Sequence, residues 1–561
     1  MVERVLNIVY KEVRGLHQAA YILAIFTFGS QLLALIRDRL LAHQFGAGIE
    51  LDLYYTAFRI PDLLYVLFAS TLSVYVLIPF IAKHIETESY DKARDLLSQI
   101  FSLFLFGYVC MAIVAMAFAP FIVHYFFPGF AEHTETLILL IRILLLQPLF
   151  LGISSLLGVI TQMKHRFVLY AISPIVYNLG IIGGLLFLYP LFGIAGLALG
   201  VVLGAILHVC IQLPFIFQSG LSPQLIFKFN MTEILIICRT SFTRAITLSL
   251  HQIVLFGFIG FASIMAIGSV SVFQFALNLQ AVPLAIIGVS YSVAAFPLLA
   301  QLFAEKKYDE LGRQIGITLR HIFFWSVPVI AFFVVIRAQF VRVILGSGAF
   351  DWNDTRLTAA VLAILIMSLT AQACNLLLVR ALYAVGNTRI PFYVTFLSSW
   401  LALFFSLSFY AALSSHDRLY ALVASTMRLE NVTGVEVLAL PLGYTLALLL
   451  HVTVMALFAR KHVYLSLRKL FMPFMQSVIG ALFGGYISYV TLNYFVTVFK
   501  TDTFHAIFAQ GLFAFICGSL GYILVQYLFR NRELAEIYCT LKRKFGKGDV
   551  IVPQDEDILA V

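Results

Sequence analysis

Charged residues lie close together where the first two apolar segments of the chain meet. The first segment ends in LALIRDRLLAHQFGAG, which contains Arg37 and Asp38, and the second begins with LDLYYTAFRIPDLLYVLF, which contains Asp52 and Arg59. A guanidinium group matches the oxygens of a phosphate with a fork of hydrogen-bond donors. Arg37 and Arg59 are therefore the predicted anion-binding residues. The structural alternative is that the four residues neutralise one another across the hairpin.

The other residues that could do chemistry form no catalytic pattern. The histidines are dispersed, and the sequence contains no H-E-x-x-H motif and no glycine-rich phosphate loop. The six cysteines have no metal-ligand spacing. We therefore predict that the chain is not an enzyme and that it has neither a cofactor nor a metal site.

The segments that carry the charged residues are long and apolar. Of the 561 residues, 61% are hydrophobic and 12% are charged, whereas a soluble domain has roughly 25% charged residues. Runs such as IFSLFLFGYVCMAIVAMAFAPFIV match the roughly 20 residues that a helix needs to cross a bilayer. A charge at the centre of such a helix costs roughly 2.5–3.5 kcal/mol, so it usually faces a partner or a cavity. We predict an all-α polytopic membrane protein.

The apolar pattern predicts about fourteen transmembrane helices. We expect them near residues 17–44, 52–82, 97–124, 134–160, 167–189, 192–217, 232–262, 268–303, 316–345, 355–384, 390–412, 435–459, 470–495 and 505–529. Lys and Arg fall mainly in the loops on the side of the N-terminus, which predicts that both termini are cytoplasmic. We expect a multi-pass protein of the bacterial cytoplasmic (inner) membrane. Its basic face would meet anionic lipid in the bilayer, and we expect no nucleic-acid partner.

An internal repeat divides this series of helices. Pro79 and Pro297 are each followed by Tyr-Asp at the same offset, so the two copies are 218 residues apart. Six predicted helices fit into this interval, and an even number is typical of parallel repeats related by an axis along the membrane normal. Two such lobes facing each other are typical of alternating access. We predict an N-terminal lobe (1–220), a C-terminal lobe (221–465), two added helices (466–530) and a cytoplasmic tail (531–561).

Five motifs follow one another in a characteristic order. They are RDRLLAHQFGAGIELDLYYTAFRIPDLL from Arg37, PGF at 128–130, ISPIVYNLGIIGG around Asn178, GSGAFD at 346–351 and RALYAVGNTRIPF at 380–392. Together they resemble the MurJ/MviN family of lipid II flippases, which belongs with the MATE exporters to the MOP superfamily. The resemblance implies a MATE-like two-lobe architecture with a V-shaped cavity whose basic residues hold a diphosphate. It also implies a groove for the polyprenyl tail on the last two helices.

The chain departs from the family pattern at several cavity positions. Gln31 and Asn278 stand where the family typically has arginines, Tyr65 replaces a third arginine, and Ser70 replaces an acidic residue. Fewer cations would attract a diphosphate less strongly, because charge-assisted hydrogen bonds are about twice as strong as neutral ones. We expect Arg37, Arg59 and Arg244 to supply the positive field, or the cargo to differ. The predicted substrate-binding residues are Arg37, Asp38, Asp52, Arg59, Asn278, Gln31 and Arg244.

The predicted function is movement of lipid II, a polyprenyl-diphosphate-linked glycolipid, from the inner to the outer leaflet by alternating access. One alternative is transport of another polyprenyl-linked glycan or amphiphile, as in Wzx or MATE proteins. Another is a non-transporting scaffold whose partners are envelope-synthesis proteins. Because the chain contains no nucleotide-binding motif, we expect coupling to the membrane potential or to a monovalent cation.

Overall fold

The computed structural model describes residues 16–69, 90–227, 229–499 and 503–545, together with Leu77 and Ile81. All regular secondary structure in these ranges is helical. Eleven helices there are long and apolar enough to span a membrane, or twelve if the bent pair Trp352–Ile366 and Leu369–Ala384 forms one span. Each expected segment overlaps a helix or a run of helices, but a total of fourteen spans is not confirmed.

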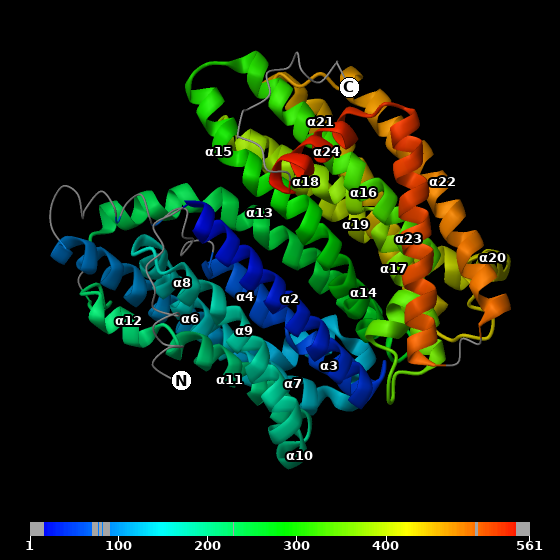
Figure 1. The fold of residues 1–561 in the computed structure, drawn as a ribbon. Coiled ribbons are helices and arrows are strands. Elements are labelled where there is room, and N and C mark those ends of the chain that lie inside the picture. Colours follow the sequence, from blue (N-terminus) through cyan, green and yellow to red (C-terminus); the bar gives the residue numbers. More distant parts are fainter. Residues whose placement is uncertain are drawn as a thin grey trace.

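The first group of helices forms one lobe (Figure 1). In this lobe α2 packs on α9, α3 on α7 and α4 on α8, and α11 packs against α7, α8 and α9. The group comprises α2 (Leu16–Phe45), α3 (Ile49–Ala57), α4 (Arg59–Ala69), α6 (Tyr90–Phe126), η1 (Pro128–His133), α7 (Thr134–Leu144), α8 (Gln147–Met163), α9 (Phe167–Gly183), η2 (Gly184–Leu188), α10 (Tyr189–Phe192), α11 (Ile194–Cys210) and α12 (Leu213–Gln218).

The second group forms the other lobe, in which α14 packs on α17, α15 on α18, and α21 on α18 and α19. Its first helix, α13, contacts α4 of the first lobe as well as α19 of its own. The group comprises α13 (Met231–Ser263), α14 (Ser269–Leu284), η3 (Ala285–Val289), α15 (Ser290–Ala304), α16 (Tyr308–Ile344), α17 (Trp352–Ile366), α18 (Leu369–Ala384), α19 (Arg389–Ser415), α20 (Asp417–Met427), η4 (Val435–Leu438) and α21 (Ala439–His462).

Three further helices are added to the second lobe. α22 (Arg468–Val498) and α23 (Phe504–Leu528) pack on each other and on α16. The last helix, α24 (Arg532–Phe545), contacts α16 through two pairs of side chains. Arg320 Nε lies 3.6 Å from Glu533 Oε1, and His321 Nε2 lies 3.0 Å from Glu536 Oε2.

The helices α6 and α16 occupy equivalent places in the two halves of the chain. Both are 37 residues long, both begin with Tyr-Asp, and their first residues, Tyr90 and Tyr308, are 218 positions apart. This agrees with the register of the predicted repeat. Pro79, on which the first copy of the motif was aligned, lies outside the described residues.

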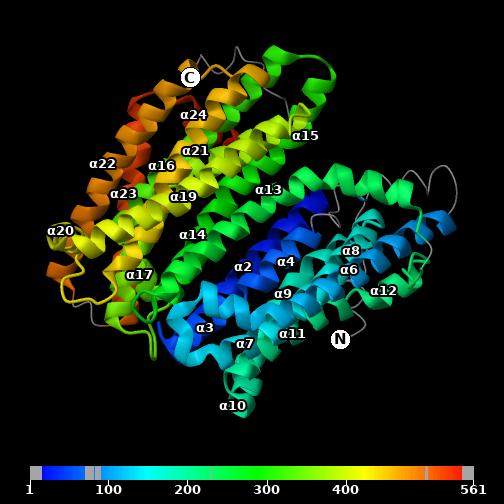
Figure 2. The same ribbon diagram turned by 180° about the vertical axis from the view of Figure 1, so that it is seen from behind.

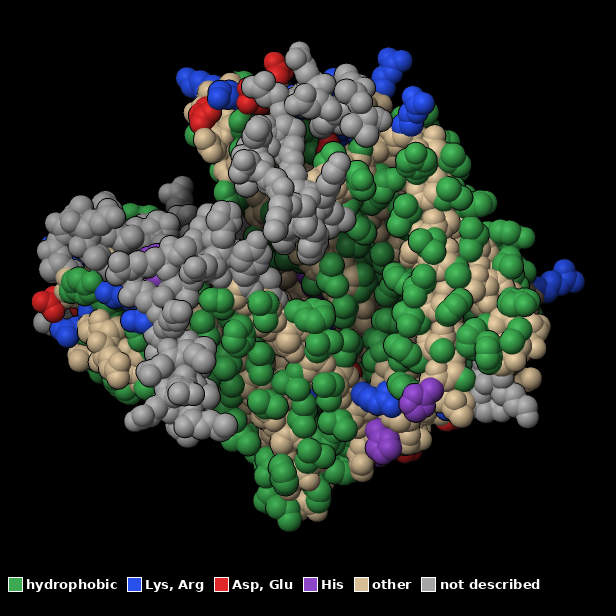
Figure 3. All heavy atoms as spheres, in the orientation of Figure 1, with side chains coloured by type: hydrophobic (Ala, Val, Ile, Leu, Met, Phe, Trp, Pro, Cys, Tyr) green, Lys and Arg blue, Asp and Glu red, His purple; other side chains and the backbone are tan. Residues whose placement is uncertain are grey.

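The two lobes meet at one end and diverge from it, as both ribbon views show (Figures 1 and 2). Between them the surface is hollowed on the face seen in Figure 3. Hydrophobic side chains cover the flanks of the helices in that view. Large apolar side chains such as Leu482 and Phe513 are exposed to the surroundings of the molecule. Apolar flanks fit a lipid environment. Polar side chains between the lobes are therefore the candidates for a functional site.

Candidate functional site

Arg37 and Asp38 form an ion pair on α2. The guanidinium Nη2 lies 2.7 Å from Asp38 Oδ1, and Nε donates to the same oxygen at 3.0 Å. The side chain of Arg37 keeps 20% of its surface exposed, against 4% for Asp38. The carboxylate is therefore enclosed, whereas the cation keeps a path to the solvent.

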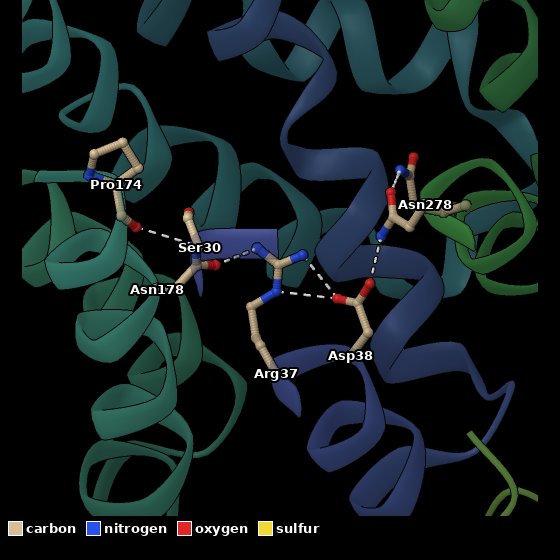
Figure 4. Close-up of polar contacts among 7 residues, drawn as sticks. Ser30, Arg37, Asp38, Pro174, Asn178 and Asn278 are labelled. Atoms are coloured by element: carbon tan, nitrogen blue, oxygen red, sulfur yellow. Dashed lines mark hydrogen bonds and ion pairs between the residues drawn. The ribbon is translucent and has the colours of Figure 1, made fainter. Parts of the chain in front are cut away.

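The second partner of Arg37 is Asn178 on α9, and Figure 4 shows the guanidinium between this amide and Asp38. Arg37 Nη1 donates to Asn178 Oδ1 at 3.1 Å. The amide nitrogen of Asn178 donates to the carbonyl oxygen of Pro174 at 3.0 Å and lies 3.5 Å from Ser30 Oγ. These two contacts turn the amide so that its oxygen faces Arg37.

Asp38 also contacts the second lobe. Its Oδ2 accepts a hydrogen bond from Asn278 Nδ2 on α14 at 2.9 Å (Figure 4). Asn278 Oδ1 in turn accepts from Gln274 Nε2 at 2.8 Å. Gln274 and Asn278 are four residues apart, so they lie on one face of the helix.

Gln274 leads back to the first lobe through Arg59 on α4. Arg59 Nη2 donates to Gln274 Oε1 at 3.3 Å and lies 3.8 Å from Asp62 Oδ2. Its Nε donates to the carbonyl oxygen of Tyr55 at 3.2 Å. A continuous chain of polar contacts thus runs from α9 through α2 and α14 to α4.

The described charges in this series of polar contacts balance in pairs. Arg37 is matched by Asp38, and Arg59 by Asp62. The links between the two pairs are the neutral amides of Gln274 and Asn278. The described part of the site therefore presents paired cations, and an anionic ligand has to compete with a carboxylate for them.

Asp52 lies on α3 and is bound elsewhere. Its carboxylate accepts hydrogen bonds from the backbone N–H of Gly268 at 2.7 Å and of Ser271 at 2.8 Å, and from the hydroxyl of Ser271. It therefore caps the N-terminus of α14 from the opposite lobe, where an anion is favoured by the helix dipole. The structural alternative, a mutual neutralisation of Arg37, Asp38, Asp52 and Arg59 across the hairpin, is not found, because each arginine has a nearer carboxylate on its own helix.

Two glycine corners dock against each other at the end where the lobes meet. Gly46 ends α2 with φ +60°, and Gly348 precedes α17 with φ +58°. A Cβ at Gly348 would overlap the carbonyl oxygen of His43, and one at Gly46 would overlap that of Ala349. The backbone N–H of Ala349 donates to the His43 oxygen at 2.9 Å. The FGAG and GSGAFD motifs are therefore complementary surfaces.

Hydrogen bonds from two further residues hold the same end together. The backbone N–H of Ala47 donates to Asp354 Oδ2 at 3.1 Å. The guanidinium of Arg39 donates to the carbonyl oxygens of Val343 at 2.5 Å and Ile344 at 3.2 Å, at the end of α16. With the Asp52 cap, these contacts close one end of the gap between the lobes.

The remaining predicted site residues contribute less to the geometry. Gln31 is half-buried on α2, about two turns before Asp38 on the same side of the helix. The side chain of Arg244 lies outside the described residues, as does Ser70. Tyr65, at a position where the family typically has an arginine, lies with its hydroxyl 3.2 Å from Ser155 Oγ.

The sequence predicted neither Gln274 nor Asp354 as a member of the polar contacts. Asp62 and Asn178 were noticed in the sequence, but not as the partners of Arg59 and Arg37. Gln274 could have been found from its spacing, because it precedes Asn278 by one helical turn. Asp354 could have been found with Asp351, since the two form a capping box at the start of α17. Among the described residues, no group of three or more His, Cys, Asp or Glu side chains is arranged to hold a metal ion.

A family model described as lipid II flippase MurJ matches residues 41–510. The chain belongs to this family. Among curated relatives, the probable lipid II flippase MurJ of Buchnera aphidicola subsp. Acyrthosiphon pisum is 29% identical over 375 residues, which is 66% of this chain and 73% of the relative. The corresponding protein of Rhizobium tropici is 27% identical over 375 residues, 65% of this chain and 70% of the relative.

Solved structures agree on the fold. A lipid II flippase MurJ in an inward closed conformation superimposes with a TM-score of 0.72 and 21% identity, covering 93% of this chain and 100% of that one. An inward-facing multidrug transporter of the MATE family gives a TM-score of 0.63 at 14% identity, covering 78% and 94%. As a member of the MurJ family with a MATE-like fold, the chain is a multi-pass transporter of the bacterial inner membrane rather than an enzyme.

Proposed function

We propose that this protein moves lipid II from the inner to the outer leaflet of the cytoplasmic membrane by alternating access. The observation that carries the proposal is the polar chain from Asn178 to Arg59, which lies between two lobes in an otherwise apolar molecule. An intramembrane arginine with an exposed edge suits the diphosphate of a polyprenyl-linked glycolipid. Membership of the lipid II flippase family supports this cargo.

The orientation follows from the positions of Lys and Arg. Both termini are cytoplasmic, so the corner at Gly46 faces outward and the diverging ends of the lobes face the cytoplasm. The contacts of Asp52, Arg39 and Ala47 then form an outer gate, and the hollow opens towards the leaflet in which the precursor is made. The lobes are residues 1–220 and 221–465, with α22 and α23 beside them. Envelope-synthesis proteins are the expected protein partners.

Arg37, Asp38, Arg59 and Asn278 form the headgroup site, and Asp52 belongs to the gate. Arg37 supplies the accessible guanidinium, and Asn278 supplies an amide donor from the other lobe. Gln31 lies on the same side of α2 and adds an uncharged hydrogen-bonding group. Arg244 remains a site residue predicted from the sequence alone.

A second cargo is favoured by one observation. Neutral or aromatic residues occupy three positions that are arginines in the family, and the described ionic groups balance in pairs. A less charged polyprenyl-linked glycan or amphiphile would suit such a site, because it needs less positive field.

The test is complementation of a bacterial strain depleted of its own lipid II flippase. The wild-type chain and Arg94→Ala, which removes only an exposed ion pair to Asp91, should restore growth and prevent accumulation of lipid II. Arg37→Ala should restore neither. If the wild-type chain is present in the membrane but lipid II still accumulates in the inner leaflet, the cargo is not lipid II.

A further inference from the structure

Donors from both lobes converge on the carboxylate of Asp38. Nε and Nη2 of Arg37 reach Oδ1 from α2, and Nδ2 of Asn278 reaches Oδ2 from α14. Figure 4 shows the two side chains approaching this carboxylate from opposite sides. A guanidinium fork together with an amide N–H is a donor set suited to phosphate oxygens. The carboxylate therefore stands where an anionic ligand would be bound.

The amide of Asn278 is held in this orientation by the residue one turn before it. Arg59 donates to Gln274, Gln274 donates to Asn278, and Asn278 donates to Asp38. All three hydrogen bonds run in the same direction, from the cation on α4 to the anion on α2. Because a guanidinium group can only donate hydrogen bonds, Arg59 fixes the donor-to-acceptor direction of all three hydrogen bonds.

We propose that Asp38 is an internal competitor for the phosphate of the headgroup. In the empty site it occupies the donors of Arg37 and Asn278, and a phosphoryl group of the incoming diphosphate displaces it and takes over both donors. Gln274 is the positioning residue that aims the Asn278 amide. The inference rests on the proposed function in its ligand class, a polyprenyl diphosphate, and goes beyond it in the roles of Asp38, Asn278 and Gln274.

Competition of this kind gives selectivity. A carboxylate held by a fork of two donors yields only to an anion that binds the same donors more strongly. A diphosphate, which carries two charges on neighbouring phosphoryl groups, does so better than an isolated phosphodiester with a single charge. The site would thus reject singly charged phosphodiester headgroups of the surrounding bilayer. It also compensates for the cations that the chain lacks at Gln31 and Asn278, since discrimination then depends on relative rather than absolute affinity.

The exchange would also link binding to the contact between lobes. In the empty site the link between α2 and α14 passes through the Asp38–Asn278 hydrogen bond. When phosphate replaces the carboxylate, the link passes through the ligand instead. A bound headgroup would then hold the two lobes together at the depth of the site.

The test measures binding of farnesyl diphosphate to the purified full-length protein by calorimetry. Asp38→Asn removes the competing charge next to a polyanion and should tighten binding by about tenfold. Asn278→Leu removes the donor and should weaken it by about tenfold, since a hydrogen bond to a charged group is lost. A wild-type affinity equal to or higher than that of Asp38→Asn would overturn the proposal. Asp38→Ser provides a second variant without the charge if Asp38→Asn does not fold.

Gln274→Glu tests the positioning role. A carboxylate at this position still accepts from Arg59 but cannot donate to Asn278, so the Asn278 amide turns its oxygen towards the ligand. Binding should fall, whereas Gln372→Glu adds the same charge to an amide whose side chain bonds only within α18 and the turn before it and should leave binding unchanged. Equal effects of the two substitutions would refute the positioning role, because they would reduce it to added charge.

The results also separate this inference from the proposed cargo. If complementation succeeds but Asp38→Asn does not tighten binding, the flippase function stands and the competitor role fails. If complementation fails while the affinities change as described, the competitor role stands for a different polyprenyl diphosphate. If neither the wild-type protein nor Asp38→Asn binds farnesyl diphosphate, the competitor role is refuted.

Discussion

Replacement of Asp52 by asparagine should loosen the end of the molecule at which the two lobes meet. The carboxylate accepts two backbone N–H groups and one hydroxyl from the start of α14. Hydrogen bonds to a charged group contribute about 1.5–3 kcal/mol each, and an anion at a helix N-terminus adds up to about 2 kcal/mol. An amide keeps one accepting oxygen and is less costly to bury, which offsets part of the loss. We expect a net weakening of the closed end by about 2–3 kcal/mol, or roughly 30- to 150-fold in the ratio of open to closed.

The assay uses a cysteine at Ser269 as a reporter of opening. Ser269 is buried at the first residue of α14, and its hydroxyl has no partner among the described groups. The substitution Ser269→Cys is therefore close to isosteric and breaks no recorded bond. In a background without the native cysteines, the rate of alkylation by a water-soluble maleimide measures how often this end opens.

The control is Glu50→Gln on the same helix. Glu50 is exposed and accepts a hydrogen bond from the hydroxyl of Tyr189 within its own lobe, so its charge does not join the lobes. Alkylation should rise strongly in Asp52→Asn and stay near the wild-type rate in Glu50→Gln. If Asp52→Asn changes the rate by less than about threefold, the carboxylate does not hold the lobes together, and the outer gate must be assigned to other contacts.

Two further predictions concern the corners and the last helix. Gly348→Ala should lower thermal stability by more than Gly386→Ala, because both sites have a positive φ but only the Cβ at Gly348 would overlap a neighbour, the oxygen of His43; equal losses measured by thermal unfolding would show that only backbone strain matters. The hydrogen bond from His321 lowers the pKa of Glu536 below its ordinary value of 4.5. A depressed carboxylate pKa stabilises the contact of α24 with α16 above the ordinary value and loses this contribution as the pH falls through the lowered one. The protection of the α24 amides against hydrogen exchange, after correction for the intrinsic exchange rate at each pH, should therefore fall on acidification below about pH 4.5, and Glu536→Gln should remove this pH dependence of the protection; a pH dependence of the protection that persists in the variant would exclude this ion pair as its cause.

The helices themselves follow from local properties of the sequence. Long apolar runs can satisfy their backbone groups in lipid only as helices, so composition and run length were sufficient to predict the class and the approximate ends. The Tyr-Asp repeat predicted the register between α6 and α16, because each copy of the dipeptide begins a helix of the same length. The number of spans was harder to predict. Where a helix pair is bent, as α17 and α18 are, the bend angle decides whether the pair counts as one span, and the sequence does not show that angle.

The site residues were predictable by type but not by partner. Arg37 and Arg59 stood out because an arginine within an apolar segment is costly unless it faces a partner or a cavity. Their partners depend on which side of each helix faces which neighbouring helix. The short spacing along the hairpin suggested Asp52 as a partner, which the structure does not show. Asp38 and Asp62 are nearer than Asp52 because residues next to each other, or one turn apart, are already in contact on a helix.

The sequence by itself thus determined a helical membrane protein with a few intramembrane charges near Arg37, and it predicted two related halves and a basic cytoplasmic face. The tertiary structure alone decided that Asp52 meets Gly268 and Ser271, that FGAG docks on GSGAFD, and that Asn278 completes a polar chain between lobes. These contacts join residues more than 200 positions apart. No local pattern encodes them, because they exist only when two independently formed helical lobes pack in one particular register.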